Sequence, residues 1–327
     1  MKNQLGTTSG GLAGTLHQPL PRKSRSSLLE KLAASALFMV LLCATIPQAS
    51  GQTYNLSNGN SVVSVNATPS SPNAGMFNYS VNGVNQVVNQ WFYYRAGSMG
   101  YQSSIDNIGA LTPVQSDARD LSLTYAGSQY SAQVVYKLTG GSLGSSSSSL
   151  NETVTFLNTS STALTLSFFE YANFGLGGTP TGQTLQFNQS LIPPPAHYNG
   201  FTQTAGSLSL TEQVSGGVGG GSPGAVNPSH VEAANYNQTL TELNSGTPIT
   251  LNDHAGPVTG DVTGTIEWDI SLNPNTSLSL SKVISITSVP EPSSTLLLGL
   301  GFVFCAIALG LRSKRDFFNS NHNHQRP

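Results

Sequence analysis

The chain has 327 residues, and only 9% of them are charged, against roughly 25% in an ordinary soluble domain. Residues 52–288 hold four basic and twelve acidic side chains, a net charge of −8, which excludes a strong affinity for phosphate backbones and makes nucleic acid an unexpected partner. The two cysteines, Cys43 and Cys305, lie in apolar terminal segments, so residues 52–288 can hold neither a disulfide framework nor a thiolate metal site. No cofactor is expected.

The N-terminal 51 residues have the pattern of a secretory signal peptide. A basic cluster at 22–25 precedes an apolar run over 32–46, and small residues follow it. This order predicts export by the Sec machinery and cleavage by signal peptidase between Gly51 and Gln52. The alternative is an uncleaved signal anchor, although the apolar run is short for a membrane span.

Residues 52–288 alternate between apolar and polar side chains with a period of two, which is typical of strands in a sheet with one buried face. Strands are predicted at 61–67, 76–81, 84–94, 121–125, 130–138, 153–157, 163–171, 264–272 and 277–287.

Three hairpins are predicted within this series of strands. Asn82-Gly83 accepts positive φ at both central positions of a two-residue turn, so it should join 76–81 to 84–94. The second hairpin turns at 126–129 and the third at 158–161.

No part of 52–288 shows a sustained helical period, and loops rich in Gly and Ser separate the strands, above all at 140–149 and 216–229. Short strands at close spacing predict an all-β antiparallel β-sandwich, either one large sandwich or two smaller ones divided near 216–229. A signal helix would precede it, and a transmembrane helix would follow it.

The C-terminal stretch has three successive parts. The motif Val289-Pro290-Glu291-Pro292 cannot continue a strand or helix, because each proline lacks an N–H. The apolar run 296–311 is just long enough to cross a bilayer core. The basic residues that follow hold the far end in the cytoplasm. They are Arg312, Lys314 and Arg315.

Over 289–315 this tail resembles the PEP-CTERM sorting signal of Gram-negative bacteria that secrete exopolysaccharide. The resemblance implies recognition and cleavage by exosortase near the motif, with the inner membrane as a transient anchor. The polar tail 316–327 departs from the family, whose members usually end soon after the arginines. An unprocessed membrane anchor is the alternative.

Three places in 52–288 carry side chains that are capable of chemistry or ligand contact. Asp253-His254 lies in a turn and could bind a metal or other ligand or act as acid and base, but a turn capped by its own side chain is the simpler explanation. Glu267 and Asp269 share the predicted solvent face of one strand, where they could act as paired carboxylates or only keep an edge soluble. Trp91 begins an aromatic cluster, 91–94, that could stack on sugar rings or pack in the core. The histidines are scattered, so no metal site is predicted.

The sequence therefore predicts an exported protein of structural or adhesive type, located in the cell envelope, at the outer surface or in the extracellular matrix. Exopolysaccharide is a candidate partner there. The alternatives are a carbohydrate-binding module using Trp91, and a polysaccharide-acting enzyme whose acids and bases would come from the turn and the paired carboxylates. The candidate catalytic residues of that enzyme are Asp253, His254, Asp261, Glu267 and Asp269.

Overall fold

The computed structural model describes residues 52–68, 75–190, 197–219 and 226–288. The chain divides into two units, Met1–Gln48 and Ala49–Pro327, and all described residues belong to the second. The predicted signal peptide, the sorting segment with its predicted transmembrane helix, and the polar tail lie outside these ranges. Within the described ranges, no helix is both long and apolar enough to cross a membrane.

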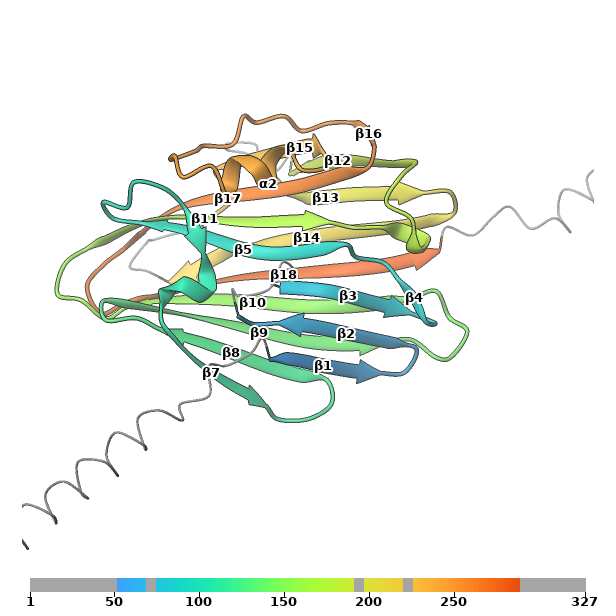
Figure 1. Ribbon diagram of the computed structural model, residues 1–327, viewed down its shortest axis with the longest axis horizontal. Coiled ribbons are helices and arrows are strands. Elements are labelled where there is room, and N and C mark those ends of the chain that lie inside the picture. The colour runs from blue at the N-terminus through green and yellow to red at the C-terminus, as the bar shows by residue number, and fades with distance from the viewer. Residues whose placement is uncertain (1–51, 69–74, 191–196, 220–225, 289–327) are drawn as a thin grey trace, which may run out of the picture. The chain divides into compact units, whose positions relative to one another are not determined.

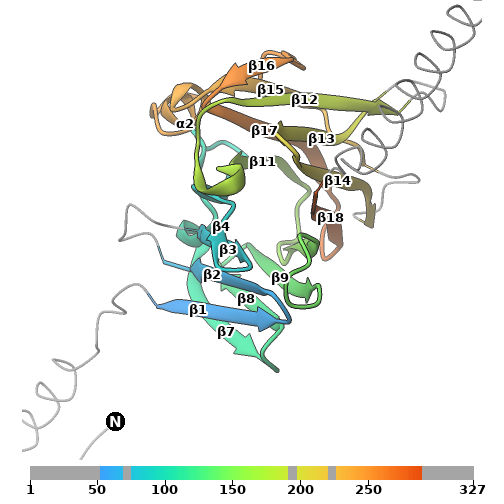
Figure 2. The same cartoon turned by 90° about the vertical axis from the view of Figure 1, so that its right-hand side faces the viewer.

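The described chain is all-β and forms two antiparallel sheets of nine strands each, which face one another as layers (Figures 1 and 2). Sheet A runs in the order β1 (Thr53–Asn58), β2 (Ser61–Asn66), β3 (Gly75–Val81), β5 (Asn89–Ala96), β11 (Leu164–Asn173), β17 (Val262–Leu272), β15 (His230–Asn235), with the short β4 (Val84–Asn85) on β3 and β6 (Ser103–Ser104) on β5. Sheet B runs β16 (Val258–Gly260), β12 (Gln183–Ser190), β13 (His197–Ala205), β14 (Leu208–Gly219), β18 (Ser277–Ser288), β10 (Ser148–Asn158), β9 (Tyr130–Gly140), β8 (Asp120–Ala126), β7 (Ala110–Gln115). The helical pieces are η1 (Ile105–Ile108), η2 (Leu176–Gly178) and α2 (Gln238–Leu243).

The first predicted hairpin is confirmed, but its second arm is not one strand. Asn82 and Gly83 have φ of 51° and 80°, and β4 pairs with β3 across them. The chain then leaves β3, because the N–H of Val88 donates to the carbonyl of Asn173 at the end of β11. The remainder of the predicted strand is β5, which pairs with β11 through the middle of sheet A.

The second predicted hairpin, β8 with β9, is confirmed, whereas the third is wrong. The strands before and after 158–161 are β10 and β11, which belong to different sheets. The side chain of Asn158 holds this crossing: its Nδ2 donates to the carbonyls of Thr162 at 2.8 Å and Leu272 at 3.2 Å, and its Oδ1 accepts the N–H of Ser160 at 3.0 Å. Alternation shows which residues face inward, but it does not reveal which sheet a strand joins.

Strands from both ends of the described chain interleave within each sheet. β18 lies between β14 and β10, and β17 lies between β11 and β15. A division near 216–229 would separate β14 from its neighbour β18, with which it pairs along its length. The described strands therefore form one large sandwich rather than two smaller ones.

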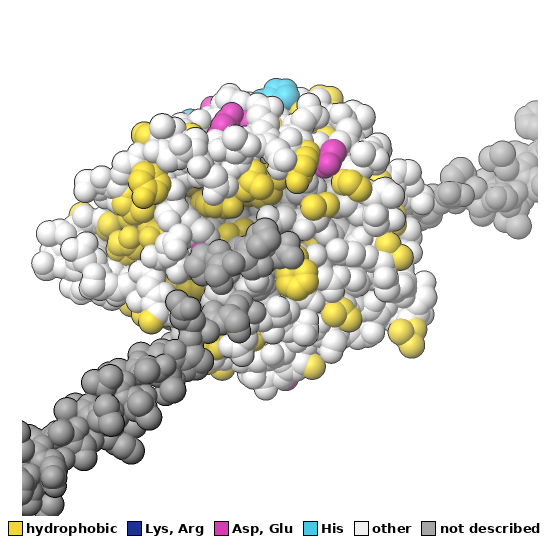
Figure 3. All heavy atoms as spheres, viewed as in Figure 1, with side chains coloured by type: hydrophobic (Ala, Val, Ile, Leu, Met, Phe, Trp, Pro, Cys, Tyr) yellow, Lys and Arg dark blue, Asp and Glu magenta, His cyan; other side chains and the backbone are white. Residues whose placement is uncertain are grey.

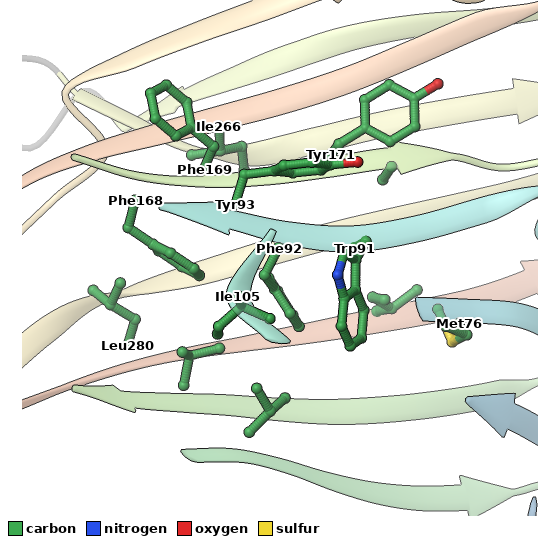
Figure 4. Packing of buried hydrophobic residues seen from close by; sticks show 14 of the residues in the cluster. Met76, Trp91, Phe92, Tyr93, Ile105, Phe168, Phe169, Tyr171, Ile266 and Leu280 are labelled. Carbon is green, nitrogen blue, oxygen red and sulfur yellow. The ribbon is translucent and has the colours of Figure 1, made fainter. Parts of the chain in front are cut away.

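The core lies between the two sheets and is aromatic at its centre. The ring of Phe168 on β11 lies 5.7 Å from that of Phe92, 5.5 Å from that of Trp268 and 5.0 Å from that of Phe156. Phe156 belongs to sheet B and the other three to sheet A, so this cluster joins the layers; Figure 4 shows Phe92 and Phe168 side by side. Leu280 of β18 approaches the same region.

Two glycines with positive φ provide a matched test of this packing. Gly75 (φ 96°) and Gly83 (φ 80°) both have conformations that L side chains rarely adopt. A Cβ at Gly75 would lie 2.3 Å from the carbonyl oxygen of Gln90 and 2.7 Å from the Trp91 ring, whereas a Cβ at Gly83 meets nothing within 4 Å. We expect Gly83→Ala to cost about 1–2 kcal/mol from backbone strain alone. Gly75→Ala should cost about 1–3 kcal/mol more because of overpacking. Urea unfolding of the two variants checks the difference, and equal losses would contradict it.

Candidate functional site

The aromatic cluster around Trp91 is structural. All four residues of 91–94 are buried, and Trp91 itself is 1% exposed. Its indole Nε1 donates to the Ser104 hydroxyl at 2.6 Å, so the polar edge is also occupied. Trp91 therefore offers no surface for a sugar ring to stack on in this structure.

Glu267 and Asp269 differ sharply, although they share one face of β17. The expectation that both face solvent is wrong for Glu267, which is fully buried because the segment before Asp253 covers it; the Leu251 N–H donates to its Oε2 at 2.9 Å. Burial is the main cause that raises the pKa of Glu267 to about 7. The side chain of Asp269 stays 53% exposed.

The structure brings Asp253 together with a histidine that the sequence did not single out. Asp253 Oδ2 lies 3.0 Å from His230 Nδ1, and His230 Nε2 lies 4.0 Å from Asp269 Oδ2. His230 faces Glu267 in the β15–β17 register. Burial by itself lowers the pKa of His230, but the hydrogen bond and charge of Asp253, followed by Glu267 and Asp269, raise it overall. His230 thus lies between two exposed carboxylates, those of Asp253 and Asp269.

His254 and Asp261 do not join this group. His254 Nδ1 lies 2.7 Å from the carbonyl oxygen of Ala233, and the Ala233 N–H donates to the carbonyl of His254. The histidine thus ties its loop to β15. Asp261 accepts a hydrogen bond from Asn173 Nδ2 at 3.4 Å.

An open groove of about 410 Å³ runs beside Asp269 on the outer face of sheet A. Arg95 Nη2 donates to the Ser167 hydroxyl at 3.0 Å, and that hydroxyl donates to Asp269 Oδ1 at 2.8 Å. Arg95 Nη1 also donates to the Ile249 carbonyl at 2.7 Å, so the guanidinium is fixed in place. The groove presents donors and acceptors suited to a polyhydroxylated ligand. Within the described ranges, no three His, Cys, Asp or Glu side chains are arranged to hold a metal ion.

The outer face of sheet B is a second candidate surface, and it is mostly hydroxyl and amide. Cross-strand hydroxyls pair at 2.8 Å between Thr155 and Ser279 and at 3.1 Å between Thr153 and Ser281. Two hollows, of about 650 Å³ and 490 Å³, lie on this face. Their linings carry the polar side chains Thr184, Gln186, Asn188, Gln189, Thr202, Thr204, Asn151, Thr153, Gln213, Ser215 and Ser281. The sequence signal was the run of Ser and Thr at alternate positions of 277–287. Figure 3, viewed as in Figure 1, shows hydrophobic side chains gathered over the middle of the face in view and acidic side chains at separate points.

A buried charged cluster was also missed. Lys282 is 6% exposed, and Glu152, Glu170 and Glu212 are at most 1% exposed. Each lies in phase with buried apolar neighbours on its strand, as Lys282 does with Leu280 and Ile284. A charge at an inward position of an alternating strand was the available signal.

Comparison with known proteins identifies one sorting motif near the C-terminal end of the chain. Residues 288–315 match the model of the PEP-CTERM protein-sorting motif, so the chain carries this motif at its C-terminal end. No curated protein sequence matches the chain.

Among solved structures, a bacterial glucoamylase complexed with acarbose is 8% identical with a TM-score of 0.46, over 78% of this chain and 36% of that one. A galactose mutarotase related enzyme from Lactobacillus acidophilus is 7% identical with a TM-score of 0.42, over 73% and 99%. An aldose epimerase homologue from C. elegans is 10% identical with a TM-score of 0.42, over 74% and 100%. These likenesses are too distant to assign an activity, and this chain spans about a third of the glucoamylase.

The buried Glu267 predicts a pH dependence of stability. Its folded pKa, about 7, lies above the ordinary 4.5, so the folded state binds the proton more tightly. The stabilisation is complete below pH 4.5 and is lost as the pH rises through 7. Glu267→Gln should therefore reduce the fall in urea midpoint between pH 5 and pH 8. A urea midpoint that falls between pH 5 and pH 8 by as much as in the wild type would contradict the prediction.

Proposed function

We propose that this chain is an exported, non-catalytic protein of structural or adhesive type, which exosortase processes at the inner membrane and which then remains in the cell envelope or extracellular matrix. The observation that carries the proposal is the sorting motif at 288–315. The sequence of the first 51 residues supports export, because it has the order of a signal peptide.

The outer face of sheet B supports the adhesive part of this proposal. The neutral hydroxyls and amides of this face can hydrogen-bond to the hydroxyls of a neutral polysaccharide without the desolvation cost of burying charges. The ligand class proposed is the exopolysaccharide of the producing cell. Weak contacts repeated over several strands give useful affinity to a polymer, because neighbouring contacts act together.

Sorting is tested by fractionation of the native host. Replacing Val289-Pro290-Glu291-Pro292 by four alanines, or deleting the host exosortase, should leave the intact chain in the inner membrane. Deleting only 316–327 is the matched control and should not change where the protein accumulates. An unchanged distribution after both the alanine replacement and the exosortase deletion would refute the proposal.

Polysaccharide binding is tested by co-sedimentation of the full chain with purified host exopolysaccharide. Ser281→Arg, on the outer face of sheet B, should weaken binding, whereas Ser271→Arg, in the groove of sheet A, should leave it intact. The reverse result would assign binding to the groove instead. Binding that neither variant changes would contradict both surfaces.

A second candidate function is a polysaccharide-acting enzyme, favoured by the juxtaposition of Asp269, His230 and Arg95 around the groove. The wild-type protein should release no reducing ends from host exopolysaccharide. Turnover that is lost in Asp269→Asn, with the fold intact by circular dichroism, would favour the enzyme over the structural role.

A further inference from the structure

The buried charged cluster lies at the centre of the sandwich and joins the two sheets. Lys282 projects inward from β18 of sheet B, and its Nζ contacts Oε1 of Glu170, which projects inward from β11 of sheet A. The same Nζ lies 3.1 Å from Glu152 Oε2 and 3.3 Å from Glu212 Oε2. Glu152 is the direct register partner of Lys282 on the neighbouring strand, so it lies beside the amine, whereas Glu170 meets it end-on from the opposite layer.

One ammonium group cannot neutralise three carboxylates in this place. Glu152 Oε1, Glu170 Oε2 and Glu212 Oε1 are buried without a hydrogen-bond partner, and the Phe92 ring lies 5.6 Å from Lys282 Nζ. Ionised carboxylates in apolar surroundings are costly, so the cluster retains protons. Burial raises the pKa of Glu152 and, together with the charge of Glu152, that of Glu212; it lowers the pKa of Lys282 to about 8. Burial thus favours the uncharged forms of the Lys282 amine and of the Glu152 and Glu212 carboxyl groups.

Gln90 fixes the relative positions of two of the carboxyl groups. Its Nε2 donates to Glu152 Oε2 and to Glu170 Oε1, each at 3.1 Å. Gln90 is fully buried on β5, next to β11 in sheet A. It therefore holds the carboxyl group of Glu152 near both the amine of Lys282 and the carboxyl group of Glu170.

We propose that Lys282 and Glu170 condense to an intramolecular amide bond that crosslinks the two sheets. The neutral Nζ attacks Cδ of the protonated Glu170 carboxyl group, the new C–N bond forms, and the C–OH bond breaks. Glu152 takes the proton that the nitrogen loses and delivers it to the departing hydroxyl, so one water molecule leaves. No oxidant, reductant or other reactant is needed.

Physical conditions in the core favour this step. Two reactants held in contact by folding react as if at very high concentration, with effective molarities of about 10⁵–10⁸ M in well-oriented cases. A positioned carboxyl group can relay the proton. The product removes a buried ionisable amine and one unpartnered carboxyl oxygen, so water expelled from the core has little means of reversing it.

The crosslink would lie close to the point where the sandwich leads into the sorting tail. β18 ends at Ser288, directly before the motif, and a bond to β11 ties this last strand to the middle of the opposite sheet. Tension on the C-terminal end would then act on a covalent bond rather than on strand pairing alone. The inference does not depend on the proposed function.

The test uses the wild-type full chain, denatured in guanidinium before digestion so that burial cannot protect any site. The side chain of Lys137 is 59% exposed and lies outside the buried cluster, so it is not acylated in either case. Cleavage by trypsin after Lys137 is therefore the internal control. No Lys or Arg lies between Lys137 and Lys282, so an acylated Lys282 yields one uncut peptide that begins at 138 and continues beyond 282. Chymotrypsin should then release a branched peptide that contains Glu170 and Lys282 and is lighter by one water. Complete cleavage after Lys282, with all peptides at full mass, would overturn the proposal.

Two variants assign the roles. Glu170→Ala should restore cleavage after Lys282, and a bond from Lys282 to Glu152 or Glu212 in the wild type would overturn the assignment to Glu170. Glu152→Gln should slow or abolish the bond while the chain keeps a cooperative unfolding transition; full bonding in this variant would overturn the role of Glu152. Because the wild-type digest decides whether the bond exists, the test holds even if a variant fails to fold.

Discussion

Lys282→Met should lower the free energy of unfolding at pH 8 by about 3–5 kcal/mol, because it leaves three buried carboxyl groups without their cation. The loss should be larger where the amide bond has formed in the wild type. The loss should shrink toward pH 5. Burial raises the folded-state pKa of Glu152 and Glu212, so their protonated forms favour the folded state at low pH, and this advantage is lost as the pH rises. Guanidinium unfolding at the two pH values measures both effects.

Lys137→Met is the matched control for this prediction. Lys137 lies on β9 of the same sheet, but its side chain is 59% exposed and pairs with Asp120 at 3.6 Å. Exposed ion pairs contribute little, so the change should stay within about 0.5 kcal/mol. A Lys282→Met protein as stable as Lys137→Met at pH 8 would show that the cluster is not stabilised by its cation.

Phe168→Ala should cost about 3–5 kcal/mol, because it removes the ring that contacts three others at the centre of the core. Since Phe156 comes from the opposite sheet, the cavity would separate the layers as well as loosen sheet A. Equilibrium unfolding in urea measures the size of the effect. The dependence of the free energy of unfolding on urea concentration should be compared with that of the wild type.

Tyr101→Ala provides the corresponding control on the surface. Tyr101 is 53% exposed, and its loss should stay within about 0.5 kcal/mol. Phe168→Leu keeps most of the volume and should lose less than Phe168→Ala. If Phe168→Ala and Tyr101→Ala were equally stable, the central aromatic cluster would not be the main packing contact between the sheets.

Most individual strands could be predicted from the sequence, because the period-two alternation reflects one buried face. The inward residues of β18 and β9 follow the predicted pattern, with Leu278, Leu280 and Ile284 on one and Val134 and Tyr136 on the other. The choice of partner strand could not be predicted. Asn158 sends the chain across to the other sheet, and its role depends on carbonyl groups more than a hundred residues away.

The candidate site was predicted only in part, for a related reason. Asp253 and Asp269 do meet around one histidine, but that histidine is His230 rather than the adjacent His254. Glu267 looked solvent-facing because alternation assigns a residue to a face and does not show what covers that face. The covering segment, which places the Leu251 N–H on the carboxylate, comes from a loop with no periodic signal.

The sequence by itself identified the sorting motif of this protein and its class of fold. Prolines, an apolar run and a basic cluster act through local chemistry, and the sorting motif can therefore be read in chain order; alternation likewise determines an all-β sandwich. Only the tertiary structure decided that Lys282 and Glu170 meet. They are far apart along the chain and belong to opposite sheets, and their contact arises from sheet order and register, which no local pattern encodes.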